Sequence, residues 1–513
     1  MVSILHSALL YCLEGQIVQV EADVSDGMPG MELVGRLARE VTEARERVRN
    51  AIKNSGFELP VRKITLNLSP ANIPKVGTGF DLAMAICILQ ATGVVRPDRT
   101  KDAIFLGELT LSGMTNPIHG ILPLVLCAKR AGFSTCYVCA QNAEEAALAE
   151  GMTVYGVQDL AGLVSHLNGR SGLHPAGRCA TLQEQGAGYE QDLKNVHGQS
   201  LAKRGLEIAV AGSHNILMSG PPGAGKSMLS GCIPSILPPL TLEECLEVTS
   251  IYSVAGKLPK GSPLITKRPF VSPHHTVTDI ALTGGGFHPR AGLVTLAHKG
   301  VLFLDEMPEF NRSVLENLRQ PLEDQKIMIA RNGGSFSYPA DFMLVGAMNP
   351  CPCGAYPDKS KCSCTTTQRR RYMGRLSKPL LDRMDLCIHV QGLNYRELSD
   401  SGQEEDSKTV RSRVVAARRI QEARFGKTKC NARMKPDEIT RFCALDEKCN
   451  ALMESAFERL SFSARGYHRI LKVARTIADL AGEERIREEH LAEALMFYRT
   501  DPEEAIDAER RPG

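Results

Sequence analysis

The octapeptide GPPGAGKS at residues 220–227 decides the fold class of this chain. The short apolar run NILMS at 215–219 precedes it, and residues 227–236 can follow as a helix that ends before Pro238. A strand, a glycine-rich loop and a helix in this order are the context that a phosphate-binding P-loop requires. Glycines let backbone N–H groups turn inward around a phosphate, and the helix N-terminus adds the positive end of its dipole. The sequence therefore predicts a parallel α/β domain that binds ATP.

Two side chains of this loop are suited to a nucleotide. Lys226 is expected to bind the β- and γ-phosphates, and the Ser227 hydroxyl to ligate Mg²⁺. A Gly/Pro turn with a chance Lys-Ser pair is the alternative, and the flanking strand and helix argue against it. The nucleotide is expected to contact the loop and the residue after it: Gly220, Pro221, Pro222, Gly223, Ala224, Gly225, Lys226, Ser227 and Met228.

Two further apolar strands end in polar residues that such a site needs. GVLFL at 300–304 is followed by Asp305 and Glu306, and the strand at 342–348 is followed by Asn349. We expect Asp305 in the Mg²⁺ shell and Glu306 orienting or activating the attacking water. Asn349 is expected to act as a sensor that helps to position this water. Alone, each pattern is an ordinary strand end, but together with a P-loop they predict ATP hydrolysis.

Length and composition limit the remaining possibilities. A chain of 513 residues is too long for one core and predicts two to four domains. The net charge of +3 does not by itself argue for nucleic acid, so such a partner needs local basic patches. No run approaches the roughly 18 to 20 apolar residues that span a bilayer, and the first residues do not read as a signal peptide. We therefore expect a cytoplasmic protein without a membrane partner.

Changes in the sequence pattern along the chain indicate separate regions. Residues 1–165 alternate strands and helices, and 166–191 are rich in Gly, Ser and Gln, as a linker is. Residues 192–394 alternate apolar strands with helices, which is typical of a parallel sheet. Residues 395–513 are expected to be helical. Their helices are expected at 406–424, 446–459, 463–481 and 486–497.

Four of the sixteen cysteines fall close together at 351–364, in two Cys-x-Cys pairs. In a cytoplasmic protein, clustered cysteines indicate metal ligands or reduced thiols rather than disulfides. Four thiolates suit a structural Zn²⁺ site, because they leave no open coordination position for catalysis. Reduced free thiols are the alternative, since zinc-binding pairs are more often separated by two or more residues. The predicted ligands are Cys351, Cys353, Cys362 and Cys364.

Motifs along nearly the whole chain carry a family resemblance. In chain order they are VGTGFDLAMAI, NVHGQSLAKRGLEIAVAG, GPPGAGKS, RPFVSPHHTVTDIALTGGG, HKGVLFLDE, NPCPCG, RLSKPLLDRMDL and SARGYHRILKVARTIADLAG. With these motifs the sequence resembles the magnesium-chelatase-like AAA+ ATPases of the YifB/ComM type. The resemblance implies an α/β P-loop AAA+ module with a helical lid, preceded by an α+β Lon-protease-like domain.

The resemblance also assigns roles to arginines, because the active site of that family lies between subunits. Arg383 in LLDRMD matches the arginine finger that reaches a neighbour's γ-phosphate, and Arg375 is a weaker candidate for the same surface. Arg465 in SARGYHRIL matches the sensor 2 arginine. A guanidinium suits these tasks because it is always charged and binds phosphate through a rigid fork. A solvated or salt-bridging arginine is the alternative for each.

The Lon-like region raises the question of peptidase activity. In PKVGTGFDLAMA, Gly79 stands where the nucleophilic serine of that protease is expected. Without a nucleophile no acyl-enzyme can form. We therefore expect this domain to serve binding or ring assembly, and we exclude a Lon-type peptidase.

Three segments offer basic or aromatic groups to DNA. They are a hairpin expected at 326–338, an insertion at 268–299 and a basic stretch beside the cysteines that includes Tyr372. Basic groups beside an aromatic ring suit single strands, although exposed solvated loops are the alternative. The candidate contacts are His274, His275, Lys299, Arg331, Arg369 and Arg370.

The resemblance implies a homo-hexameric DNA helicase that drives branch migration when incoming single strands recombine during natural transformation. Its expected partners are single-stranded or branched DNA and recombination proteins. The competing class is an ATPase that remodels proteins or metal centres, like the chelatase subunit. As far as the resemblance goes, that subunit lacks the Lon-like domain and the cysteine cluster, so the sequence favours the DNA motor.

Overall fold

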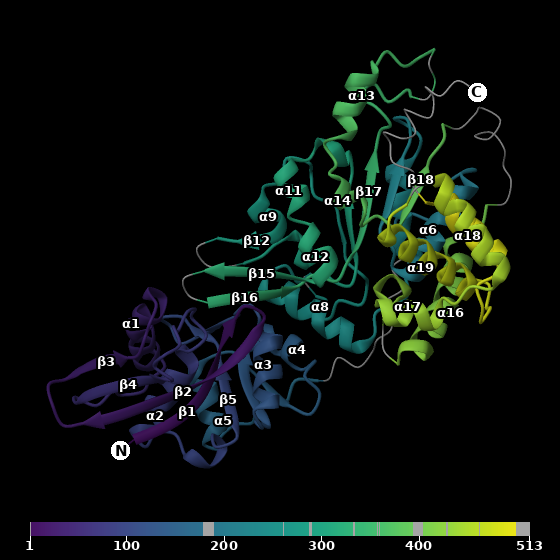
Figure 1. The fold of residues 1–513 in the computed structure, drawn as a ribbon. Coiled ribbons are helices and arrows are strands. Elements are labelled where there is room, and N and C mark those ends of the chain that lie inside the picture. Colours follow the sequence, from purple (N-terminus) through teal and green to yellow (C-terminus); the bar gives the residue numbers. More distant parts are fainter. Residues whose placement is uncertain are drawn as a thin grey trace. The chain divides into compact units, whose positions relative to one another are not determined.

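The computed structural model describes residues 2–177, 189–259, 261–286, 290–331, 334–356, 358, 360–392, 404–426, 429–460 and 462–498 (Figure 1). The chain forms two compact units. The first comprises Met1–Gln183 and Thr241–Thr266, and the second comprises Glu184–Leu240 and Lys267–Gly513. The segment 241–266, which lies inside the 192–394 range expected for the ATPase core, thus belongs to the first unit.

A mixed seven-stranded sheet forms the centre of the first unit, in the order β3-β4-β2-β1-β5-β8-β9. Helices pack into two separate apolar cores, and alternate side chains of β1, such as Ala8 and Leu9, enter different cores. Successive side chains of a strand point to opposite faces, so helices cover both faces of this sheet. The strands are β1 (Val2–Tyr11), β2 (Glu14–Ser25), β3 (Gly30–Val34), β4 (Lys63–Ser69), β5 (Ala103–Leu106), β8 (Thr135–Cys139) and β9 (Thr153–Val157). The helices are α1 (Arg39–Asn54), α2 (Asp81–Ala91) and α5 (Leu160–Leu167) in one core, and α3 (Ile121–Arg130) and α4 (Ala143–Ala146) in the other.

Two elements of this unit were not expected from the sequence. Strand β1 is buried on both faces over part of its length, so it lacks the apolar–polar alternation of a half-buried strand. Helix α8 (Leu242–Val254) follows the P-loop region in sequence but packs against α3. The Ser253 hydroxyl on α8 donates a hydrogen bond to the Glu145 carboxylate of α4.

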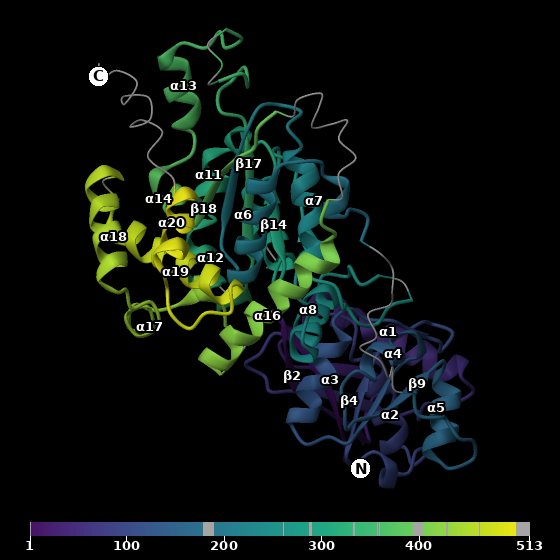
Figure 2. The ribbon, with the colours of Figure 1, turned by 90° about the vertical axis from the view of Figure 1, so that its right-hand side faces the viewer.

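A five-stranded parallel sheet forms the centre of the second unit, in the order β11-β14-β17-β10-β18. Strands β14, β17 and β18 of this sheet are labelled in Figure 2. Every residue of β14 and β17 is buried, as is usual for a parallel strand covered on both faces. The strands are β10 (Ile216–Ser219), β11 (Phe270–Val271), β14 (Val301–Leu304), β17 (Met343–Met348) and β18 (Leu386–His389). Helices α6 (Ser200–Gly212) and α7 (Lys226–Ile236) flank β10 in sequence.

Helices form the C-terminal part of this unit, and α16 and α19 pack against α6. They are α16 (Ser407–Phe425), α17 (Pro436–Phe442), α18 (Glu447–Leu460), α19 (Ala464–Leu480) and α20 (Glu488–Met496). The sequence pattern predicted four of them and missed the short α17. The predicted fold class, an α/β P-loop module with a parallel sheet and a helical lid, preceded by an α+β N-terminal domain, is confirmed. No helix in the described part of the chain is long and apolar enough to cross a membrane.

Candidate functional site

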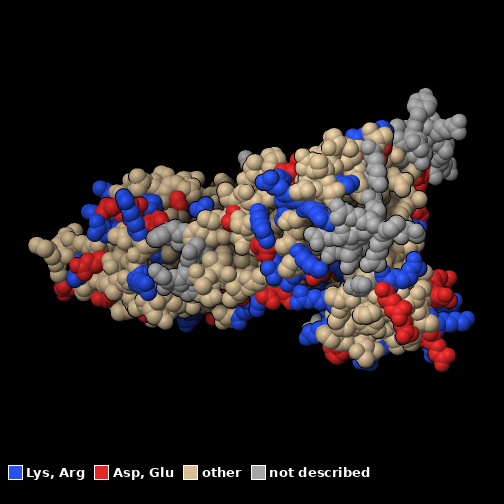
Figure 3. Space-filling model, turned by 45° about the horizontal axis from the view of Figure 1, so that its top comes forward, with Lys and Arg blue, Asp and Glu red and all other residues tan. Residues whose placement is uncertain are grey.

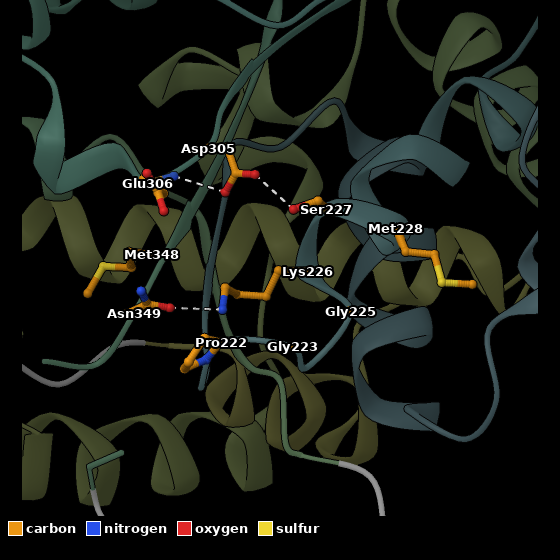
Figure 4. A pocket seen from close by; sticks show the side chains of 10 residues that line it. All are labelled: Pro222, Gly223, Gly225, Lys226, Ser227, Met228, Asp305, Glu306, Met348 and Asn349. Carbon is orange, nitrogen blue, oxygen red and sulfur yellow. Dashed lines mark hydrogen bonds between the residues drawn. The ribbon is translucent and has the colours of Figure 1, made fainter. Parts of the chain in front are cut away.

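The P-loop and the two other polar strand ends meet at one cavity of about 350 Å³ (Figure 4). Strands β14, β17 and β10 are neighbours in the parallel sheet, so their carboxyl ends reach the same edge. The lining residues are Pro222, Gly223, Gly225, Lys226, Ser227, Met228, Asp305, Glu306, Met348 and Asn349. Met348, at the end of β17, is the lining residue that the sequence reasoning did not name.

Three glycines give the loop its shape. Gly223 and Gly225 have φ angles of 79° and 87°, a left-handed conformation that glycine adopts without the steric penalty of a side chain. Gly220 lies against β18, because a Cβ there would be 2.2 Å from the carbonyl oxygen of Val390. The local sequence therefore fixes the backbone course that the cavity needs.

Lys226 is buried at the base of the cavity and is held by three acceptors. Its Nζ donates hydrogen bonds to the carbonyl oxygens of Gly220 (2.7 Å) and Pro221 (2.8 Å) and to Oδ1 of Asn349 (3.2 Å). Burial lowers the pKa of Lys226, and the nearby carboxylates of Asp305 and Glu306 oppose this shift. The P-loop and the end of β17 are thus linked through one ammonium group.

The Ser227 hydroxyl and the Asp305 carboxylate face each other across the cavity. Oγ of Ser227 donates to Oδ2 of Asp305 at 2.8 Å, and Oδ1 of Asp305 accepts the backbone N–H of Glu306 at 2.9 Å. Mg²⁺ takes oxygen ligands and is commonly bound through one or two carboxylates together with substrate phosphates. The oxygen donors at this point therefore fit that cation.

Glu306 has an unusual backbone and an unexpected neighbour. Its φ of 49° and ψ of 44° are left-handed, a conformation that costs about 1–3 kcal/mol for a non-glycine residue and is frequent at functional sites. Nδ1 of His275 lies 3.9 Å from Oε2 of Glu306, and the His275 ring packs against His274 in a tilted arrangement with 4.1 Å between centroids. The sequence singled out His275 as a DNA candidate, but the structure places it beside this carboxylate.

The arginines assigned by resemblance lie outside the lining of the cavity. Arg383 pairs with Glu323 and donates to the carbonyl oxygen of Pro379 at 2.7 Å, so its guanidinium is engaged within its own chain. Arg465 is exposed in the first turn of α19. Arg375 pairs with Glu309 at 2.6 Å, near the end of the 307–309 turn that follows Glu306.

The four predicted cysteines come together beyond the end of β17. Their sulfur atoms all lie within 4.8 Å of one another. The Sγ atom of Cys351 is 3.4 Å from that of Cys353 and 3.8 Å from that of Cys362, and those of Cys353 and Cys362 are 3.6 Å apart. Cys351 is fully buried, whereas the others are partly or wholly exposed. The group can hold one metal ion.

The other DNA candidates belong to helix α13, to the insertion at 268–299 and to the predicted hairpin. Arg369 lies on α13 (Thr366–Met373), with its guanidinium 4.3 Å from the ring centroid of Tyr356, and Arg370 is half-buried on the same helix. His274 is exposed. The predicted hairpin is present as β15 (Lys326–Arg331) and β16 (Gly334–Pro339), but the Arg331 side chain and residues 332–333 lie outside the described residues.

Lys299, another DNA candidate, makes an internal contact in the structure. Its Nζ contacts Oδ2 of Asp341 at 2.9 Å, and the lysine side chain is only 18% exposed. Arg433 contacts the other oxygen of Asp341 at 3.1 Å. Lys299 therefore belongs to a charge cluster between the sheet and the helical region, and its ammonium is engaged within the chain.

Lys299→Ala is expected to lower the free energy of unfolding by about 1–3 kcal/mol at neutral pH, because it removes a hydrogen bond between charged groups. Burial raises the pKa of Asp341, but Arg433 and Lys299 together lower it to about 2. A lowered carboxyl pKa stabilises the fold above the unfolded value of about 4, and this contribution is lost as the pH falls toward 2. Urea unfolding of Lys299→Ala beside that of the exposed Lys448→Ala measures the difference. Equal stability of the two variants would contradict the internal role.

Gly79, which stands where the sequence places the protease nucleophile, lies close to Ile118. A Cβ on Gly79 would be 3.2 Å from Cδ1 of Ile118, a tight contact with the end of a side chain. The absence of a serine or other nucleophile at this position remains the reason for expecting no Lon-type peptidase activity.

Three family descriptions match the chain in sequence order. "Subunit ChlI of Mg-chelatase" matches residues 20–142, "Magnesium chelatase, subunit ChlI" matches 192–398, and "Magnesium chelatase, subunit ChlI C-terminal" matches 404–499. The competence protein ComM of Haemophilus influenzae is 42% identical over 501 residues, which cover 96% of this chain and 97% of ComM. The uncharacterised protein YifB of Escherichia coli is 39% identical over 503 residues, or 97% of each chain. A Lon protease of Mycolicibacterium smegmatis is 30% identical over 137 residues, or 25% of this chain and 17% of the protease.

The chain therefore belongs to the YifB/ComM-type magnesium-chelatase-like proteins. Proteins of this family are AAA+ ATPases, and the family implies ATP and Mg²⁺ at the cavity. The residues present fit both groups. Lys226 offers a buried ammonium to a phosphate, and Ser227 and Asp305 offer oxygen ligands to the cation.

Proposed function

We propose that this chain is an ATP-hydrolysing motor that forms a homo-hexameric ring in the cytoplasm and acts on DNA. Its activity is that of a helicase that drives branch migration of single-stranded or branched DNA together with recombination proteins. The observation that carries the ATPase part is the convergence of Lys226, Asp305, Glu306 and Asn349 on one cavity. The N-terminal unit serves binding or ring assembly in this proposal.

Each group at the cavity has a task in hydrolysis. The Lys226 ammonium exchanges its carbonyl partners for the β- and γ-phosphates, and Ser227 and Asp305 hold Mg²⁺, which neutralises developing phosphate charge. Glu306 orients the attacking water and accepts its proton, and the Asn349 amide fixes the position of that water. The 3.2 Å contact between Lys226 and Asn349 supports this division, because the amide then lies beside the group that is expected to bind the γ-phosphate.

A second copy of the chain completes the site in this proposal. The lining contains no arginine among the described residues, so the charge that develops on the γ-phosphate needs a guanidinium from elsewhere. Arg383 leaves Glu323 on assembly and reaches the neighbour's phosphate, while Arg465 of the helical region acts as the second phosphate sensor. Arg375 stays with Glu309.

Local basic groups support DNA as the substrate, although the net charge is small. Lysine and arginine side chains gather over part of the surface with few acidic groups between them (Figure 3). Arg369 and Arg370 on α13 and the hairpin carrying Arg331 are the proposed contacts, together with the exposed His274. One relative bears the name competence protein, which we take to support a role with incoming DNA in natural transformation.

His275 is the proposed link between DNA and hydrolysis. It belongs to the same insertion as His274 and contacts Glu306, the residue that would activate water. A strand that binds to this insertion would move the imidazole and change the position of the carboxylate. DNA would thereby control the rate of ATP turnover through one contact.

The ATPase rate of the full-length chain is expected to rise when single-stranded or forked DNA is added. Arg331→Ala and Arg369→Ala weaken the stimulation, and His275→Ala uncouples the rate from DNA while DNA binding itself persists. Steady-state turnover and fluorescence anisotropy with a labelled strand, each with and without DNA, measure the two effects. A rate that ignores every DNA structure would contradict the proposal.

The alternative is an ATPase that remodels a protein or a metal centre. It is supported by the family descriptions, which all name a magnesium chelatase subunit. The same assay separates the two functions, because this alternative predicts stimulation by a protein partner and none by DNA.

We further propose that the four cysteines hold a structural Zn²⁺ ion. Tetrahedral thiolates at a Zn–S distance of about 2.3 Å have sulfur atoms about 3.8 Å apart. The three close sulfur pairs at 3.4, 3.6 and 3.8 Å support this geometry. Four protein ligands leave no position for a substrate, so the ion would have a structural task.

A further inference from the structure

The cysteine cluster lies directly against the nucleotide site, and two contacts join them. Asn349, which lines the cavity and contacts Lys226, is two residues from the fully buried Cys351. Gly354, between the two cysteine pairs, packs against the P-loop. We propose that the metal held by these cysteines braces the nucleotide site, so that metal occupancy sets the affinity for ATP. This inference rests on the proposed ATP and Zn²⁺ sites and adds the coupling between them.

The first contact joins the cluster to the P-loop itself. A Cβ on Gly354 would lie 2.5 Å from Cδ and 3.1 Å from Cγ of Pro222, so the glycine backbone touches the proline ring. Gly354 is buried, and its φ of 79° is left-handed. Its N–H donates to the carbonyl oxygen of Cys351 at 3.0 Å, which ties this turn to the cluster. A shift of the cysteines would therefore shift the surface on which Pro222 rests.

The second contact involves Asn349, which lies near both ends of the cysteine segment, residues 351–364. On one side, the chain runs from Asn349 into Cys351. On the other side, Cys364 leads into α13, where the buried Tyr372 lies near the Asn349 backbone, which opposes the burial that raises the pKa of this tyrosine to about 12. The sulfur contact between Cys351 and Cys362 joins these two sides. A bound metal would close this ring of contacts around the amide that meets Lys226.

The segment has few other means of holding its shape. Of the residues between the cysteine pairs that the structure describes, Gly354 is the buried one, and Asp358, Ser360 and Lys361 are exposed. A segment without an apolar core needs another source of folding free energy, and ligation of a metal supplies it. Without a metal this segment loses that source of folding free energy, and Asn349 and Gly354 would be held less firmly.

Metal content and nucleotide binding of the full-length protein test the proposal together. We expect about one zinc per chain in the wild type, and no retained zinc in the Cys362→Ser/Cys364→Ser variant. The metal-free protein is expected to bind a fluorescent ATP analogue about 10- to 100-fold more weakly, a range like that seen when groups that orient a site's ligands are removed. Restoring zinc to chelated wild type restores the affinity. Cys127→Ser, which removes a thiol of the first unit, is the matched control.

A second variant disturbs the contact between Gly354 and Pro222 without removing any metal ligand. Gly354→Ala keeps all four cysteines but adds a Cβ that meets Pro222, so it is expected to retain zinc and still lose nucleotide affinity. Gly426→Ala is its control, because Gly426 has a comparable φ of 67° and no atom within 4 Å of an added Cβ. Far-UV circular dichroism confirms that each variant is folded.

The outcomes distinguish this inference from the functions on which it rests. A zinc-loaded wild type that does not bind the ATP analogue would contradict the proposed ATPase. Absence of zinc from the purified protein would contradict the metal site. In a third outcome, the wild type binds zinc and ATP while both the metal-free protein and the Gly354→Ala variant keep the wild-type affinity for ATP. That result would overturn only the proposed coupling between the metal and the nucleotide site.

Discussion

Lys226→Ala is expected to reduce ATP hydrolysis by about two to three orders of magnitude, because loss of one preorganised hydrogen-bond donor at a reacting centre costs about 100- to 1,000-fold. The ammonium is buried and lies between the P-loop carbonyls and Asn349, so no other described cation of the lining can replace it. Water that fills the space of the missing side chain cannot neutralise the phosphates.

The matched controls for this variant separate chemistry from folding. Lys226→Met keeps most of the apolar stem and is expected to be equally inactive, whereas the exposed Lys448→Ala retains wild-type turnover. Phosphate release at saturating ATP is the measurement, with circular dichroism as a check on the fold. Turnover within a few-fold of the wild type in both Lys226 variants would remove this residue from the site.

Glu306→Gln is expected to slow hydrolysis by at least about 100-fold while ATP binding is kept, since general-base catalysis contributes about 10²- to 10⁴-fold. The amide has nearly the same shape as the carboxylate but cannot take a proton from water. The backbone N–H of Glu306 donates to Oδ1 of Asp305 at 2.9 Å, a contact that does not involve the Glu306 side chain. Single-turnover hydrolysis and nucleotide titration separate the two steps.

If each active site is shared between two subunits, the Glu306→Gln variant supports a further prediction. Mixing Glu306→Gln subunits with Arg383→Ala subunits brings an intact Glu306 together with an intact Arg383 at some interfaces. Turnover of the mixture is therefore expected to exceed that of either variant alone. A mixture no more active than its components, although the subunits assemble together, would contradict the trans role of Arg383.

Much of the second unit follows from sequence because its signals are local. The glycine loop, its strand and its helix are contiguous, and the residues after β14 and β17 follow short apolar runs. Parallel pairing of these strands then requires their ends to meet. The four cysteines likewise lie within fourteen residues, so their proximity needed little tertiary information.

The features that the sequence did not predict depend on contacts between distant segments. From the sequence alone, Lys299 is expected to be a solvated cation. The fold brings Asp341 into contact with it and Arg433 into contact with Asp341. His275 reads as a loop residue until the insertion lies next to β14 and brings it to Glu306. Strand β1 shows no clear period because both of its faces are buried. No local pattern contains this information.

Calorimetric titration of the full-length chain with ATP and Mg²⁺ tests the central claim most directly. We expect saturable binding that is lost when Lys226 is replaced by alanine and kept when Glu306 is replaced by glutamine. If the folded wild type gives no binding heat and ATP displaces no fluorescent analogue from it, the nucleotide site is contradicted. Every function derived from that site then fails with it.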